Sequence, residues 1–287
     1  MENKRLYSPA RVKEILDMYG FRFSKGLGQN FLIDGNIVRE IVKRAEVSKE
    51  DQVLEIGPGI GTLTEELALN ADKVVAIEID ERLRPVLADT LSTYDNTEIV
   101  FGDVLKLPLD EILKEKFEDK PVKVVANLPY YVTTPIIGKL LEEGLAFDSI
   151  SVMVQKEVAD RMIANPGSKD YGALTLFIKF YTEPEVLLRV PKSVFMPQPK
   201  IDSTVVRLKL KKELPDIDRE LYSKLVKAAF SKRRKTIINA LSTYGLEFDK
   251  QTLKEALQRA GIEETARGEE LTVEKYIQLV RQLTRSE

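Results

Sequence analysis

Short apolar runs alternate with amphipathic stretches over the first half of the chain. The apolar runs have the length of buried strands and lie at residues 53–56, 73–78, 97–101, 123–126 and 149–154. Stretches with helical spacing lie between them, at residues 63–69, 81–92 and 135–143. Buried strands that alternate with helices are typical of a parallel sheet covered on both faces. We therefore predict an α/β fold that binds its ligands at the carboxyl ends of the strands.

The second half of the chain changes character. Helices are predicted at residues 155–163 and 172–181. Two further helices are predicted before the first strand, at residues 8–19 and 36–46. Two strand-like runs, 185–190 and 204–210, predict an antiparallel hairpin at the sheet edge, joined by a stiff proline-rich loop over 194–203. After residue 212 only helical patterns occur, at 219–230, 235–243, 250–260 and 272–284. The chain is therefore expected to form a domain over 1–212 and a small all-helical domain over 213–287.

Three glycines, Gly57, Gly59 and Gly61, follow the first predicted strand and lead into a helix. Such a turn brings bare backbone close to a ligand. The spacing G-x-G-x-G differs from the G-x-G-x-x-G pattern of dinucleotide sites, so a pyrophosphate is not expected. Glu78 ends the next strand, where a carboxylate can reach a ribose. S-adenosylmethionine, a nucleoside without phosphate, fits both features, and a plain tight turn is the alternative.

Composition narrows the chemistry of the 287 residues. The absence of cysteine excludes disulfides and thiolate metal ligands, and no metal site is predicted. The absence of histidine excludes imidazole acid–base catalysis and the Ser-His-Asp triad. The formal net charge is -2, so affinity for nucleic acid must come from a local basic patch. No signal peptide or membrane-spanning run is evident, so we expect a cytoplasmic protein.

Four features fall at the carboxyl ends of predicted strands: the turn at Gly57, then Glu78, Asp103 and Asn127. Because the carboxyl ends of parallel strands meet at one edge of a sheet, we expect these features to form one composite site. The alternative is that these four features belong to four unrelated turns, but their shared position at strand ends favours a single site.

The sequence Asn127-Leu-Pro-Tyr130 indicates methyl transfer to a nucleobase amine. The lone pair of such an amine is delocalised into the ring, so the nitrogen must pyramidalise before it attacks a methyl sulfonium. Two acceptors that face its N–H hydrogens favour this geometry, namely the side-chain oxygen of Asn127 and the Leu128 carbonyl, held by Pro129. Tyr130 offers an aromatic face on which the base stacks. The alternative is an Asn-x-Pro loop with a packing tyrosine.

Two stretches are candidates for RNA contact. Residues 21–31 mix aromatic, basic and glycine residues, which suits a mobile arm against a ligand or RNA, although an ordinary surface loop has the same composition. The run 232–235 is basic in an otherwise acidic chain and lies at a predicted helix start, where backbone N–H groups favour phosphate; a solvated face is the alternative. The candidate RNA-binding residues are Arg22, Lys25, Lys232, Arg233, Arg234 and Lys235.

Together these motifs resemble the bacterial small-subunit ribosomal RNA adenine dimethyltransferases (the KsgA/RsmA group). The resemblance rests on Gly28-Gln-Asn-Phe-Leu32, Leu54-Glu-Ile-Gly-Pro-Gly, Ala126-Asn-Leu-Pro-Tyr and Phe195-Met-Pro-Gln-Pro-Lys-Ile-Asp-Ser203, and on the helical tail. It implies a Rossmann-like class I S-adenosylmethionine-dependent methyltransferase fold. It also implies that methyl groups pass to N6 of two adjacent adenosines in a hairpin near the 3′ end of small-subunit (16S) ribosomal RNA during ribosome biogenesis. Each adenosine is methylated twice.

The resemblance also implies roles for single residues. Those expected to contact the cofactor are Gln29, Asn30, Leu32, Gly57, Glu78, Asp103 and Asn127. Those expected to hold the target adenine are Asn127, Leu128, Tyr130 and Phe195. In this assignment Glu78 binds the ribose hydroxyls, Asp103 binds the adenine amine of the cofactor, and Phe195 stacks on the target base. The chain departs from the family at Tyr131-Val-Thr-Thr, where many relatives have Asn-Ile-Ser-Thr, just after the four-residue motif.

Three other functions share some of these features. The large-subunit ribosomal RNA dimethyltransferases that confer macrolide resistance typically carry isoleucine at the position of Leu128. DNA adenine methyltransferases use a related Asn-Pro-Pro-Tyr motif, usually beside a separate target-recognition region. A protein without catalytic activity that binds immature small subunits is a third possibility, and the complete set of rim residues argues against it. We expect a monomer whose partner is the small ribosomal subunit and its ribosomal RNA, without membrane association.

Overall fold

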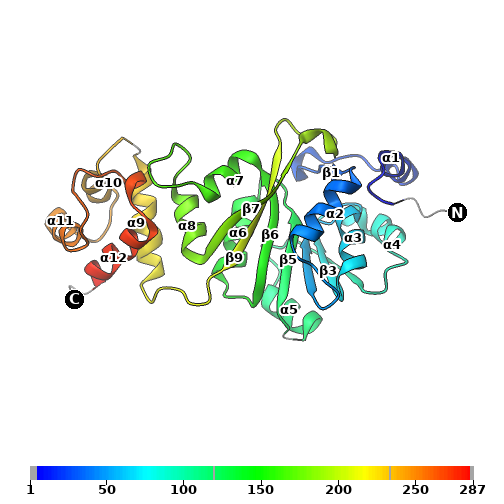
Figure 1. Ribbon diagram of the computed structural model, residues 1–287, viewed down its shortest axis with the longest axis horizontal. Coiled ribbons are helices and arrows are strands. Elements are labelled where there is room, and N and C mark those ends of the chain that lie inside the picture. Colours follow the sequence, from blue (N-terminus) through cyan, green and yellow to red (C-terminus); the bar gives the residue numbers. More distant parts are fainter. Residues whose placement is uncertain (1–4, 119, 233, 285–287) are drawn as a thin grey trace. The chain divides into compact units, whose positions relative to one another are not determined.

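The computed structural model describes residues 5–118, 120–232 and 234–284, with the backbone alone at residue 25 (Figure 1). Its strands are β1 Phe31–Leu32, β2 Gln52–Ile56, β3 Lys73–Glu78, β4 Thr97–Phe101, β5 Val122–Asn127, β6 Phe147–Gln155, β7 Thr182–Val190, β8 Phe195–Met196 and β9 Ser203–Leu210. Its α-helices are α1 Pro9–Met18, α2 Gly35–Arg44, α3 Thr62–Asn70, α4 Arg84–Thr90, α5 Leu109–Phe117, α6 Thr133–Glu142, α7 Lys156–Ile163, α8 Ala173–Tyr181, α9 Arg219–Ser231, α10 Ile237–Ser242, α11 Lys250–Arg259 and α12 Val273–Thr284.

The main sheet has the order β4-β3-β2-β5-β6-β9-β7. The strands from β4 to β6 run parallel, and β9 is antiparallel to β6. Val53, Val125 and Met153 pack with helices α2 and α3 on one face. Their neighbours Leu54, Val124 and Val152 point to the other face and are also fully buried. The predicted α/β fold with a covered parallel sheet is therefore confirmed.

Helix α5 was not predicted from the sequence. It begins after Pro108, and Leu109, Ile112, Leu113 and Phe117 form its buried face. These positions follow the three-and-four spacing of an amphipathic helix, so the signal was present in the sequence. The helix returns the chain from the end of β4 to the start of β5.

The proline-rich stretch predicted as a loop contains the short strand β8. This strand pairs with β1, with Leu32 opposite Phe195 and Phe31 opposite Met196. Ile33 extends the pairing by donating its backbone N–H to the Val194 carbonyl at 2.9 Å. The stretch therefore ties the N-terminal segment to the sheet edge.

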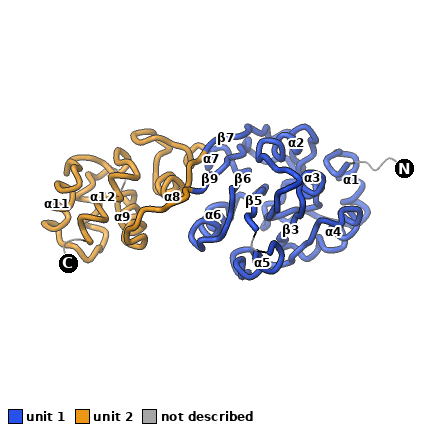
Figure 2. The backbone as a smooth tube through the Cα atoms, turned by 60° about the horizontal axis from the view of Figure 1, so that its bottom comes forward, with its two compact units in different colours: residues 1–159, 185–210 blue, residues 160–184, 211–287 orange. Residues whose placement is uncertain are grey.

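The described residues fall into two compact units, which Figure 2 colours blue (1–159 and 185–210) and orange (160–184 and 211–287). The predicted boundary after residue 212 is close to the division between 210 and 211. The prediction of one continuous domain over 1–212 differs from the structure, since 160–184 belong to the helical unit. The reason is the apolar face of α8: Phe180 packs on Tyr222 of α9 with ring centroids 4.6 Å apart.

In the described part of the chain, no helix combines the length and the apolar character needed to cross a membrane.

Candidate functional site

The turn between β2 and α3 depends on its glycines. Gly57, Gly59 and Gly61 have φ angles of 75°, 60° and 92°, a region of backbone conformation that residues other than glycine rarely adopt. A Cβ atom at Gly59 would also lie 2.8 Å from the ring of Phe31. The turn therefore holds bare backbone against the N-terminal segment, and the predicted tight turn has a steric cause.

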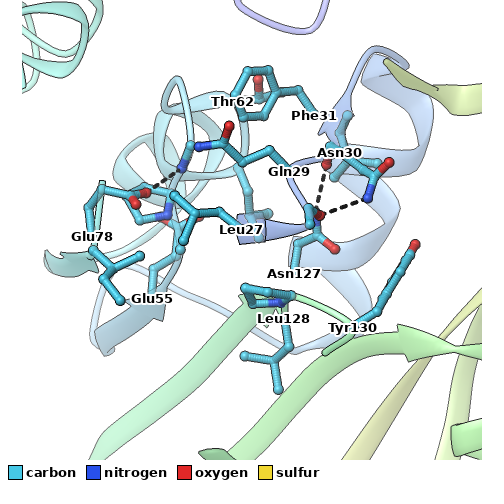
Figure 3. A pocket seen from close by; sticks show the side chains of 18 residues that line it. Leu27, Gln29, Asn30, Phe31, Glu55, Thr62, Glu78, Asn127, Leu128 and Tyr130 are labelled. Atoms are coloured by element: carbon cyan, nitrogen blue, oxygen red, sulfur yellow. Dashed lines mark hydrogen bonds between the residues drawn. The ribbon is translucent and has the colours of Figure 1, made fainter. Parts of the chain in front are cut away.

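Glu78 lies at the carboxyl end of β3 and points toward this turn (Figure 3). Its Oε2 accepts the backbone N–H of Gly59 at 3.2 Å, and its Oε1 accepts that of Asp80 at 2.8 Å. The residue is 4% exposed, and burial raises the pKa of its carboxyl to about 7 despite these two donors. The carboxylate is thus fixed beside the glycine turn, where the sequence predicted it.

The segment predicted as an arm or a loop is tied to the rim through Asp80. Gln29 donates its Nε2 to Asp80 Oδ2 at 2.8 Å, and its own Oε1 accepts the Ser24 backbone N–H at 2.9 Å. Arg82 donates its Nη2 to the same Asp80 oxygen at 2.6 Å, and its guanidinium lies 5.0 Å from the ring centroid of Phe21. This pairing lowers the pKa of the Asp80 carboxyl. Asp80 was not predicted, although it stands two residues after Glu78.

The loop after β5 is held from both sides. Asn127 donates its side-chain Nδ2 to the backbone carbonyl of Asn30 at 3.2 Å (Figure 3). At the other end, the Pro129 carbonyl accepts the Thr133 hydroxyl at 3.0 Å and the Val132 backbone N–H at 3.2 Å. Leu128 as a whole is 1% exposed, and it lines the cavity drawn in Figure 3.

Two cavities lie along the rim and share Gly57, Ile79 and Pro129. The first cavity, drawn in Figure 3, is lined by Leu27, Gly28, Gln29, Asn30, Phe31, Leu32, Glu55, Gly57, Pro58, Gly59, Thr62, Leu63, Glu78, Ile79, Asn127, Leu128, Pro129 and Tyr130. The second cavity is lined by Ile56, Gly57, Ile77, Ile79, Gly102, Asp103, Val104, Leu105, Pro129, Tyr131, Val132 and Ile136. The structure thus brings together the predicted cofactor residues and Asn127, Leu128 and Tyr130.

The two cavities differ in character. The first has carboxyl and amide side chains around the glycine turn, which suits a charged ligand group. The second is mostly apolar, and Asp103 is the charged residue among its described lining. The Asp103 carboxylate is held by the Leu105 backbone N–H at 3.0 Å and by Lys106 Nζ at 3.6 Å. Apolar walls with one acceptor suit a flat heterocycle that carries an amine.

Glu55 and Thr62 are further residues of the first cavity that were not predicted. Both are buried, and Glu55 Oε2 and the Thr62 hydroxyl have no hydrogen-bond partner in the described part of the chain. Burial raises the pKa of the Glu55 carboxyl to about 8. A charged residue within the buried strand β2 is unusual, so the sequence did carry a signal for Glu55. Unpaired polar atoms of this kind fit a polar ligand.

Phe195 does not line either cavity. It is 3% exposed and packs in the core between the sheet and helices α2 and α3. Its stacking on a target base therefore stays a prediction. Tyr131, where the chain departs from the family pattern, is 57% exposed and forms part of the wall of the second cavity.

The candidate RNA-binding residues belong to both units. Arg22 is exposed in the first unit, and Lys232, Arg234 and Lys235 are exposed between α9 and α10 in the second. Arg233 and the side chain of Lys25 lie outside the described residues. The run lies between two helices, as predicted, but α10 begins at Ile237 and not at 235, so the run ends just before the N-cap residue Thr236. The run lies in the connection before that helix.

A family model for ribosomal RNA adenine dimethylase matches residues 20–285. A ribosomal RNA small subunit methyltransferase A from Alkaliphilus oremlandii is 53% identical over 283 residues, which cover 98% of this chain and 99% of the relative. The protein with the same name from Clostridioides difficile is 50% identical over 274 residues, which cover 95% of this chain and 94% of the relative.

Two solved structures share the fold over most of the chain. A dimethyladenosine transferase from Plasmodium falciparum has a TM-score of 0.75 at 28% identity, and covers 89% of this chain and 98% of its own. The 23S ribosomal RNA methyltransferase ErmE has a TM-score of 0.66 at 29% identity, and covers 88% of this chain and 99% of its own. The predicted resemblance is confirmed: the chain belongs to the ribosomal RNA adenine dimethylase family, whose members are methyltransferases.

Proposed function

We propose that this chain transfers methyl groups from S-adenosylmethionine to N6 of two adjacent adenosines in a hairpin near the 3′ end of 16S ribosomal RNA. The observation that carries the proposal is the fixed amide of Asn127 beside the glycine turn. A carbonyl oxygen can only accept a hydrogen bond, so the Asn30 carbonyl holds the amide nitrogen and leaves Oδ1 of Asn127 free for another donor. The names of the most similar relatives support ribosomal RNA as the substrate.

The two cavities fit the parts of S-adenosylmethionine in turn. The ammonium and carboxylate of its methionine end match the first cavity, with its bare turn and the unpaired oxygens of Glu55 and Thr62. Its ribose hydroxyls match Glu78, which lines the first cavity next to Ile79, a residue that the two cavities share. Its adenine matches the apolar second cavity, with Asp103 as acceptor for the exocyclic amine. When bound, S-adenosylmethionine supplies an electrophilic methyl carbon.

The last residue of β5 and the residue that follows it orient the attacking amine. Asn127 Oδ1 and the Leu128 carbonyl each accept an N–H of the target N6, so the lone pair turns out of the ring plane toward the methyl carbon. With S-adenosylmethionine bound, these two acceptors would hold N6 for attack on the methyl carbon, with the sulfonium sulfur as the leaving group and the N6 proton passing to solvent water. After the first transfer one N–H remains, and a single acceptor holds it for the second. This scheme needs no tuned general base, in keeping with a chain without histidine.

Tyr130 supplies the aromatic face for the flipped base. Its ring stands beside Asn127 and Leu128 in Figure 3 and lines the same cavity. Stacking of a base on an aromatic side chain contributes about 1–3 kcal/mol and is tolerant of sequence. Tyr130 therefore favours any extruded base, and the paired acceptors select one with an exocyclic amine.

The chain has a net charge of -2, so it has no overall attraction to RNA and must bind RNA through local basic patches. We assign this role to the run 232–235, with Arg22 and Lys25 of the N-terminal segment. A flipped adenine looks the same in every hairpin, so the choice of hairpin requires contacts with RNA shape and phosphates away from the pocket.

The proposal is tested by incubating the protein with labelled S-adenosylmethionine and small subunits that lack the modification, followed by mapping of the labelled nucleotides. The expected product is dimethyladenosine at two adjacent positions near the 3′ end. Label on the large subunit would contradict the proposed substrate. Tight subunit binding without label would instead indicate an assembly factor.

A further inference from the structure

The hydroxyl groups of Tyr130 and Ser203 lie 2.8 Å apart and form a hydrogen bond. Tyr130 belongs to the loop after β5, while Ser203 is the first residue of β9, far along the sequence. Ser203 is 1% exposed and does not line either cavity. Ser203 therefore meets the site only through the far end of the Tyr130 ring.

Ser203 is held in place by its surroundings. It stands opposite Gln155 in the antiparallel pairing of β9 with β6. The preceding residue, Asp202, accepts the Lys156 backbone N–H on its carbonyl at 3.0 Å and the Lys192 backbone N–H on its carboxylate at 3.0 Å. A buried hydroxyl on a strand anchored at this point has little freedom to move.

Two torsion angles position a tyrosine ring. Rotation about the first swings the whole ring and displaces the hydroxyl most, whereas the hydroxyl lies on the axis of the second and does not move with it. A hydrogen bond from a fixed partner to that hydroxyl therefore restricts the first torsion and so fixes where the ring lies. A partly buried tyrosine hydroxyl also requires a partner. Reaction rates are sensitive to such restrictions, because small displacements of the reacting base cost catalysis.

We propose that Ser203 is a positioning residue that fixes where the Tyr130 ring lies, and so the surface on which the target adenine stacks. Ser203 touches neither base nor cofactor and acts through Tyr130. The inference rests on the proposed function, in which Tyr130 contacts the target base. It gives a specific task to the last residue of the proline-rich motif, which the chemistry of the pocket leaves without one.

The test is a double-mutant cycle with Ser203→Ala, Tyr130→Phe and the pair of changes together. The measurements are kcat and KM for undermethylated small subunits and the dissociation constant of S-adenosylmethionine. Each single variant should lower kcat/KM about tenfold, as expected for one hydrogen bond. The double variant should be no worse than the single ones, and affinity for S-adenosylmethionine should not change in any of them.

Ser151 provides a matched control. It is also 1% exposed, lies on the neighbouring strand β6, and its hydroxyl has no hydrogen-bond partner in the described part of the chain. Ser151→Ala removes the same atom from the same sheet and should keep wild-type kinetics. A Ser203→Ala variant that behaves like Ser151→Ala would overturn the inference, as would additive losses in the cycle.

Tyr130→Ala separates this inference from the proposed function. If Tyr130→Ala keeps full turnover, the role of Tyr130 in the proposed function is wrong, and the inference fails with it. If Tyr130→Ala is impaired while Tyr130→Phe and Ser203→Ala match the wild type, the proposed function stands and the positioning role of Ser203 is wrong. Thermal unfolding of each variant shows whether a loss reflects folding.

Discussion

The backbone carbonyl of Asn30 accepts a hydrogen bond from the side-chain amide of Asn127 at 3.2 Å. This contact joins the N-terminal segment to the end of β5, where we propose that the target base binds. Asn30 also donates its own side-chain Nδ2 to the Gly28 carbonyl at 2.8 Å, which stabilises the bend of the segment. The residues proposed to bind the cofactor and those proposed to bind the base therefore form one connected structure, in which the orientation of the Asn127 amide depends on the segment around Asn30.

Replacement of Glu78 tests the cofactor assignment. Glu78→Ala should weaken S-adenosylmethionine binding by roughly 1–3 kcal/mol, because charge-assisted hydrogen bonds to the ribose are lost. Calorimetric titration measures the change. Glu81→Ala is the control, since Glu81 is exposed in the next turn and pairs with Arg84. Equal affinities for wild type and Glu78→Ala would remove Glu78 from the cofactor site.

Glu55 gives the protein a pH-dependent stability. Burial raises the pKa of its carboxyl from 4.5 to about 8 in the folded protein. The folded state therefore binds the extra proton between these values, and its stability falls as the pH rises through this window. Glu55→Gln removes this term. Between pH 6 and pH 8, the free energy of unfolding should fall more for the wild type than for Glu55→Gln, by about 1.4 kcal/mol per pH unit.

Urea unfolding at the two pH values measures this difference. Glu157→Gln is the control for loss of a carboxylate, because Glu157 is exposed on α7. If wild type and Glu55→Gln lose stability in parallel as the pH rises, Glu55 is ionised in the folded protein over the whole range.

The basic run is tested by reversing two of its described charges. Arg234→Glu combined with Lys235→Glu should weaken binding to small subunits and flatten its salt dependence, since each lost phosphate contact removes roughly 0.7–0.9 from the log–log slope. Affinity for S-adenosylmethionine should not change. The control carries Lys250→Glu and Lys254→Glu, two exposed positions on α11. Equal slopes for both double variants would show that residues 232–235 are only a solvated face.

Local patterns predicted much of the fold. Strands β3 and β4 were predicted with the bounds that the structure has, because each is an apolar run closed by polar or glycine residues. The rim residues Glu78 and Asp103 followed from the rule that parallel strands end at one edge. Each of these predictions depends on residues close together in the sequence.

Contacts between distant parts of the chain could not be predicted in this way. The pairing of β1 with β8 joins Leu32 to Phe195, and nothing local to either residue indicates the other. The same holds for the bonds of Asn127 to Asn30 and of Tyr130 to Ser203. The assignment of 160–184 to the helical unit likewise depends on tertiary packing of α8.

The central claim is that Asn127 contributes to catalysis mainly by orienting the attacking amine, although it also lines the cavity proposed for the cofactor. Its most direct test is Asn127→Ala, measured by single-turnover methyl transfer to undermethylated small subunits and by calorimetric titration with S-adenosylmethionine. The loss falls on geometry reached in the transition state, so the rate should fall by about 100-fold or more while cofactor affinity stays near that of the wild type. A variant that keeps substantial turnover, or that loses cofactor affinity as much as rate, would contradict this account.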